Sequence, residues 1–106
     1  MNNWLSIGPV DQIPRQGARV VELEGVEIAV FRTVDDKIFA LVDRCPHKGG
    51  PLSQGIVFGD RVACPLHNWH IDLASGEALA PDEGCAGHFA TKVTDGEVYI
   101  ATTQSA

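Results

Sequence analysis

Two short segments of this chain each combine one cysteine and one histidine with a high density of glycine and proline. The first contains Cys45 and His47, and the second contains Cys64 and His67. Neither segment has the period of a helix or a strand, so both are expected to be loops of fixed shape. A short strand pattern at 61–63 leads into the second loop, and the two loops therefore flank one hairpin.

Most of the remaining chain consists of short runs that are rich in β-branched and aromatic residues, as in β-strands. Polar turn signals such as Glu24-Gly25 and Asp95-Gly96 separate these runs and predict antiparallel hairpins. No segment has the pattern of an amphipathic helix. The expected strands are 19–23, 26–31, 37–42, 61–63, 69–73, 89–93 and 98–101.

The length of 106 residues suits one modest hydrophobic core, so we expect a single domain over 1–106. A hydrophobic fraction of 44% and a charged fraction of 21% are ordinary for a globular protein. The sequence therefore predicts one all-β unit with a loop-rich insert at one end.

The formal net charge of -6, with only eight basic residues, argues against a nucleic acid or an anionic membrane surface as partner. The acidity suits either docking to a basic protein surface or solubility alone. No segment has the length and hydrophobicity needed to cross a bilayer, and the N-terminus lacks a basic and apolar leader. The expected location is therefore the cytoplasm.

Cys45, His47, Cys64 and His67 supply two thiolates and two imidazoles, which are suited either to zinc or to a 2Fe-2S cluster. Zinc modules usually keep both cysteines in one knuckle and both histidines in another, whereas here each loop provides one of each. Two irons held between facing loops explain this alternation better than one zinc ion does. Zinc, or buried thiols with ordinary surface histidines, are the remaining alternatives.

These two loops resemble the ligand boxes of the Rieske family at that family's usual separation. The resemblance implies an antiparallel β sandwich with a small cluster-binding subdomain at about 44–73, a Rieske-type 2Fe-2S cluster held by the four residues, and a role in electron transfer. It also implies that His47 and His67 form an exposed tip, with Pro51 and Leu52 beside it. Gly50 and Leu66 stand where high-potential members carry extra cysteines, and the expected reduction potential is therefore low for the family.

Four segments resemble the sequence of the small subunit of NAD(P)H-dependent assimilatory nitrite reductase: 45–55, 64–69, Gly76-Glu77 and 82–85. That resemblance implies a large subunit with flavin and siroheme, which reduces nitrite to ammonium and holds the catalytic centre. The alternative is a Rieske ferredoxin that carries electrons from a flavoprotein reductase to a ring-hydroxylating oxygenase. No nucleophile, acid-base pair or phosphate cradle accompanies the loops, so catalysis needs a partner.

The remaining chemically notable residues are expected to have structural roles. Cys85 is expected to be a small apolar packing residue, and His70 and His88 lack a matching second ligand nearby. Trp4 and Trp69 are expected to pack in or near the core. Three glycines are expected to permit close backbone approach or positive φ around the cluster: Gly49, Gly50 and Gly55.

Overall fold

The computed structural model describes residues 3–45, 50–65, 69–79 and 84–104. Within them the chain forms short β-strands and two 3-10 turns. No helix in the described part of the chain is long and apolar enough to span a membrane. The elements are β1 (Trp4–Pro9), η1 (Val10–Gln12), β2 (Gly17–Leu23), β3 (Val26–Arg32), β4 (Ile38–Val42), η2 (Leu52–Gln54), β5 (Ile56–Phe58), β6 (Arg61–Ala63), β7 (His70–Asp72), β8 (His88–Phe89), β9 (Thr91–Thr94) and β10 (Glu97–Ala101).

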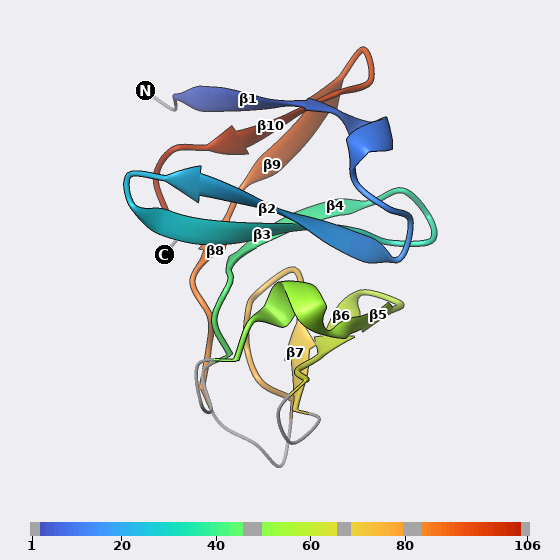
Figure 1. Ribbon diagram of the computed structural model, residues 1–106, viewed down its shortest axis with the longest axis vertical. Coiled ribbons are helices and arrows are strands. Elements are labelled where there is room, and N and C mark those ends of the chain that lie inside the picture. The colour runs from blue at the N-terminus through green and yellow to red at the C-terminus, as the bar shows by residue number, and fades with distance from the viewer. Residues whose placement is uncertain (1–2, 46–49, 66–68, 80–83, 105–106) are drawn as a thin grey trace.

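The strands form antiparallel sheets, which we name A, B and C. Sheet A has the order β1-β10-β9, sheet B has the order β2-β3-β4-β8, and sheet C has the order β5-β6-β7. Figure 1 shows sheet A at the top, sheet B in the middle and sheet C below. The predicted all-β fold is confirmed.

Sheet B is covered on both faces, which explains the continuous apolar run in β3. Ile28 and Val30 belong to a buried cluster shared with sheet A, whereas Ala29 and Phe31 belong to a second cluster shared with sheet C. All four side chains are fully buried. A strand that alternates its side chains between two covered faces needs an apolar residue at every position.

The predicted hairpins agree with the observed pairing, but three strands differ from expectation. β2, β3 and β4 form the expected meander, and β9 and β10 meet at the Asp95-Gly96 turn. The expected strand 89–93 is divided, because β8 pairs with β4 in sheet B and β9 pairs with β10 in sheet A. β1 and β5 were not predicted, since β1 buries Ile7 alone and β5 is only three residues long.

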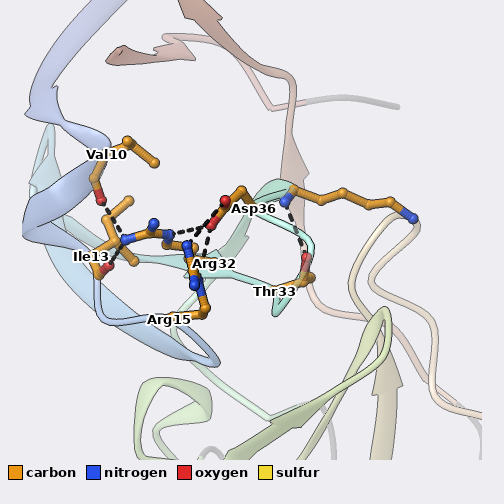
Figure 2. Close-up of polar contacts among 7 residues, drawn as sticks. Val10, Ile13, Arg15, Arg32, Thr33 and Asp36 are labelled. Atoms are coloured by element: carbon orange, nitrogen blue, oxygen red, sulfur yellow. Dashed lines mark hydrogen bonds and ion pairs between the residues drawn. The ribbon is translucent and has the colours of Figure 1, made fainter.

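An arginine cluster attaches η1 to the turn between β3 and β4 (Figure 2). The Arg32 guanidinium donates to the carbonyl oxygens of Val10 and Ile13, at 3.4 and 3.0 Å, and to Asp36 Oδ1 at 2.8 Å. Arg15 donates to both carboxylate oxygens of Asp36, at 3.3 and 3.2 Å. The hydrogen bond from Arg32, and then the charge of Arg15, hold the pKa of Asp36 below its ordinary value of 3.8.

We expect the Asp36→Asn variant to melt at a lower temperature than the wild type at pH 7 and to approach it near pH 3. Because the pKa of Asp36 is lower in the folded state than in the unfolded state, the ionised carboxylate stabilises the fold above about pH 4. This stabilisation is lost as the pH falls through 3.8 toward the folded-state pKa. Melting curves between pH 7 and pH 3 test the prediction, with Asp35→Asn as control. A difference in melting temperature between Asp36→Asn and the wild type that stays constant from pH 7 to pH 3 would contradict the prediction.

Candidate metal centre

The two loop cysteines lie in the apolar core between sheets B and C. Cys45 follows β4 and is 2% exposed, and Cys64 follows β6 directly and is 1% exposed. Both belong to the buried cluster that contains Phe31 and Leu41 of sheet B. Two loops that are distant in sequence thus deliver their thiols to one core.

Each loop is closed by a backbone hydrogen bond from its cysteine. The Cys45 N–H donates to the Gly50 carbonyl oxygen at 2.8 Å, across residues 46–49. The Cys64 N–H donates to the Trp69 carbonyl oxygen at 2.6 Å, across residues 66–68. These bonds fix the ends of both loops, and β6 and β7 hold the second loop at the end of sheet C.

His47 and His67, the predicted imidazole ligands, lie outside the described residues. The four-residue ligand set with Cys45 and Cys64 therefore stays a prediction. In the part of the chain that the structure describes, no three His, Cys, Asp or Glu side chains are grouped to hold a metal ion. A metal centre that contains Cys45 and Cys64 and has three or more ligands of these types therefore needs at least one ligand from outside the described residues.

The donor set in the described core fits an iron-sulfur cluster. Buried thiolates are unfavourable in apolar surroundings unless a cation neutralises them, and iron is such a cation. The chain supplies one buried thiol from each loop, Cys45 and Cys64. Apolar side chains of sheets B and C surround both thiols.

Glycine at position 55 permits close backbone packing beside the loops. A Cβ atom there would lie 2.2 Å from the carbonyl oxygen of Ala63 and 2.9 Å from a methyl carbon of Val62. No side chain fits at such distances, so the expected close approach is confirmed at Gly55. Gly50 is buried at the end of the first loop, and Gly49 lies outside the described residues.

Two expectations about single residues were wrong. Leu52, expected to be accessible beside the tip, is fully buried with the cysteines, whereas Pro51 is exposed. Cys85 does not pack in the core; it is exposed and forms an isolated bridge with Glu77. Local sequence does not distinguish these cases, because burial here depends on whether sheet B covers the residue.

Three other notable side chains, those of His70, Trp69 and Trp4, make packing contacts. The His70 and Phe58 rings form a T-shaped pair, with 5.1 Å between ring centroids. Trp69 packs against the cysteine-containing cluster, as expected. Trp4 is half-buried, and the Lys92 ammonium lies 4.6 Å from the centroid of its ring.

The comparisons with known proteins identify relatives of the whole chain. Ferredoxin CarAc of Metapseudomonas resinovorans is 34% identical over 100 residues, which cover 92% of both chains. The ferredoxin subunit of 3-phenylpropionate/cinnamic acid dioxygenase from Photorhabdus laumondii is 34% identical over 102 residues, which cover 94% of this chain and 95% of that protein. Other relatives are longer: 4beta-methylsterol monooxygenase of Methylococcus capsulatus is 46% identical over 59 residues, only 16% of its length.

Solved structures of two functional kinds share the fold. A chain in the complex of reduced oxygenase and oxidized ferredoxin of carbazole 1,9a-dioxygenase has a TM-score of 0.86 and 30% identity, with 97% of this chain and 96% of that chain covered. A protein assigned as the small subunit of an NADPH nitrite reductase has a TM-score of 0.83 and 27% identity, with 92% and 97% covered.

The family model for the Rieske 2Fe-2S domain matches residues 3–99. The match includes both cysteine loops, all of sheets B and C, and sheet A up to residue 99. A Rieske-type 2Fe-2S cluster is therefore the cofactor, and its chemistry is electron transfer. This chain belongs to the Rieske 2Fe-2S domain family.

Proposed function

We propose that the chain is the electron-transfer small subunit of an NAD(P)H-dependent nitrite reductase that reduces nitrite to ammonium in nitrate assimilation. The observation that carries the proposal is the resemblance of 45–55 and 64–69, together with the Gly76-Glu77 turn and the run 82–85, to that subunit. In this proposal a separate large subunit with flavin and siroheme holds the catalytic centre, and both subunits are cytoplasmic.

The described part of the downstream motif forms a structured unit that packs on the core of the two cysteines. Glu77 forms a bridge with Cys85, and the Ala78 N–H donates to the Gly84 carbonyl oxygen at 2.8 Å. The Ala86 N–H donates to the Gly76 carbonyl oxygen at 2.7 Å, and the Ala86 side chain belongs to the cysteine-containing cluster. The motif is thus connected to the core that holds both thiols.

In the proposed site, Cys45 and Cys64 would hold one iron of the cluster, and His47 and His67 would hold the other. Held by these residues, the cluster would supply one-electron transfer. The residues of the chain keep the thiol side of the site dry, since both cysteines are at most 2% exposed and lie under sheet B. The net charge of -6 favours docking to a basic surface of the large subunit.

The second candidate is a ferredoxin of a ring-hydroxylating dioxygenase system. The observation that favours it is the identity of 34% to two dioxygenase ferredoxins over at least 92% of this chain. Size and cofactor suit both candidates. A flavoprotein reductase and an oxygenase would then be the partners.

Reconstitution of both systems in parallel tests the choice. We expect the cluster-loaded chain to accelerate NAD(P)H-dependent ammonium formation by the siroheme subunit encoded in the same organism. We expect no acceleration of aromatic hydroxylation by a flavoprotein reductase and oxygenase from that organism. The opposite pattern would establish the second candidate.

A matched variant separates electron transfer from a structural role in the complex. The Cys64→Ser chain removes one proposed ligand and leaves the acidic surface unchanged. We expect it to fail in the nitrite assay. Full activity with this variant would show that the chain supports the large subunit without carrying electrons.

A further inference from the structure

Asp43 connects sheet B to the far end of the first cysteine loop. Its backbone N–H donates to the Glu27 carbonyl oxygen at 2.9 Å, so the residue is attached to the start of β3. Its side chain is half-buried and faces η2. Oδ1 accepts the Ser53 backbone N–H at 2.7 Å, and Oδ2 accepts the Ser53 hydroxyl at 2.8 Å. Both carboxylate oxygens are therefore used by one residue.

This pair encloses the hydrogen bond that closes the loop. Asp43 lies two residues before Cys45, and Ser53 lies three residues after Gly50, so the bond between Cys45 and Gly50 falls inside the span of the Asp43–Ser53 contact. Leu52, next to Ser53, is fully buried against the cysteines. Hydrogen bonds to a carboxylate are about twice as strong as neutral ones, so the contact restrains both ends of the loop.

The corresponding contact after the second loop is local. There the Asp72 carboxylate uses one oxygen, Oδ2, to accept the Ser75 N–H and hydroxyl, three residues further along the same turn. It spans no cysteine. Among the described residues, Asp43 is therefore the one carboxylate whose hydrogen bonds connect the two sides of a cysteine loop.

We propose that Asp43 is a positioning residue for the cluster: it keeps the first loop closed through Ser53, and its negative charge lowers the reduction potential. The inference rests on the proposed ligand role of Cys45. A fixed negative charge in partly buried surroundings opposes the arrival of an electron at a nearby cluster. The hydrogen bonds restrain the loop that Cys45 begins, and this slows the loss of iron.

Four variants of the cluster-loaded chain separate the charge from the hydrogen bonds. Asp43→Asn removes the charge but leaves an oxygen that can accept the Ser53 N–H, Asp43→Glu keeps the charge, and Ser53→Ala removes only the hydroxyl bond. Asp60→Asn is the control, because Asp60 is an exposed carboxylate that is paired with Lys37 and lies outside both cysteine loops in the sequence. The reduction potential at one fixed pH and the rate of iron loss to a chelator are measured for each.

We expect Asp43→Asn to raise the equilibrium constant for reduction on the order of tenfold, or about 59 mV, with Asp43→Glu and Ser53→Ala near the wild type. Asp43→Asn and Ser53→Ala should both lose iron faster than Asp60→Asn. If Asp43→Asn shifts the potential no more than Asp60→Asn does, the inference is wrong even though the wild-type spectrum supports the ligand set. If Asp43→Asn does not fold, unchanged iron loss in Ser53→Ala overturns it. A wild-type chain without a Rieske spectrum would instead reject the proposed ligands.

Discussion

We expect the Cys64→Ser variant to be colourless and to contain almost no iron, whereas the wild type has a Rieske spectrum with two irons per chain. The Cys64 side chain is 1% exposed in the core under sheet B, so no solvent ligand can easily replace a lost thiolate. A serine hydroxyl is a harder donor than the thiolate that iron-sulfur clusters use. Visible absorption, iron content and the paramagnetic signal of the reduced protein measure the loss.

Cys85→Ser is the matched control for this experiment. Cys85 is exposed and is bridged to Glu77, outside both cysteine loops, so the same chemical change there should leave spectrum and iron content unchanged. A Cys64→Ser variant that keeps the full spectrum would contradict the ligand set. Colourless wild-type protein containing zinc would instead support the zinc alternative.

The sequence predicted the parts of the fold that depend on local signals. The meander of β2, β3 and β4 depends on turns such as Glu24-Gly25, where both residues have positive φ. β1 forms by pairing with β10 at the other end of the chain, where Trp4 lies opposite Ala101. Its own sequence shows little of the alternation between buried and exposed residues that predicts a strand. The bend at Ala90, where the chain passes from sheet B to sheet A, has no local signal either.

The candidate site was predictable to a similar extent. Residue type, spacing and the family resemblance pointed to Cys45 and Cys64, and the structure brings both into one buried cluster. Their ligand role with His47 and His67 stays a prediction. The burial of Leu52 and the exposure of Cys85 could not be predicted, because both depend on how sheets B and C pack together. The role of Asp43 was also missed. A carboxylate two residues before a loop cysteine is a weak signal until its bond to Ser53 is seen.

The shared core makes the cysteine loops sensitive to changes in the packing of the turn after sheet C. We expect Gly76→Ala to lower the free energy of unfolding by about 3 kcal/mol or more, among the largest effects of a single substitution. Gly76 has φ +77°, and a Cβ there would lie 2.1 Å from the carbonyl oxygen of Ala86. The backbone must therefore move apart, which breaks the hydrogen bond from the Ala86 N–H to the Gly76 carbonyl oxygen.

Gly96→Ala separates this contact from the cost of positive φ. Gly96 has φ +78°, nearly the same as Gly76, but a Cβ at this position in the β9–β10 turn would have no other atom within 4 Å. Positive φ alone should cost Gly96→Ala about 1 to 2 kcal/mol. At about 4–8 °C per kcal/mol, Gly76→Ala should melt visibly below Gly96→Ala. Equal melting temperatures of the two variants would show that the segment containing Ala86 moves away from the new Cβ atom without a loss of stability. In that case the motif from Gly76 to Ala86 would not be rigidly connected to the core of the two cysteines.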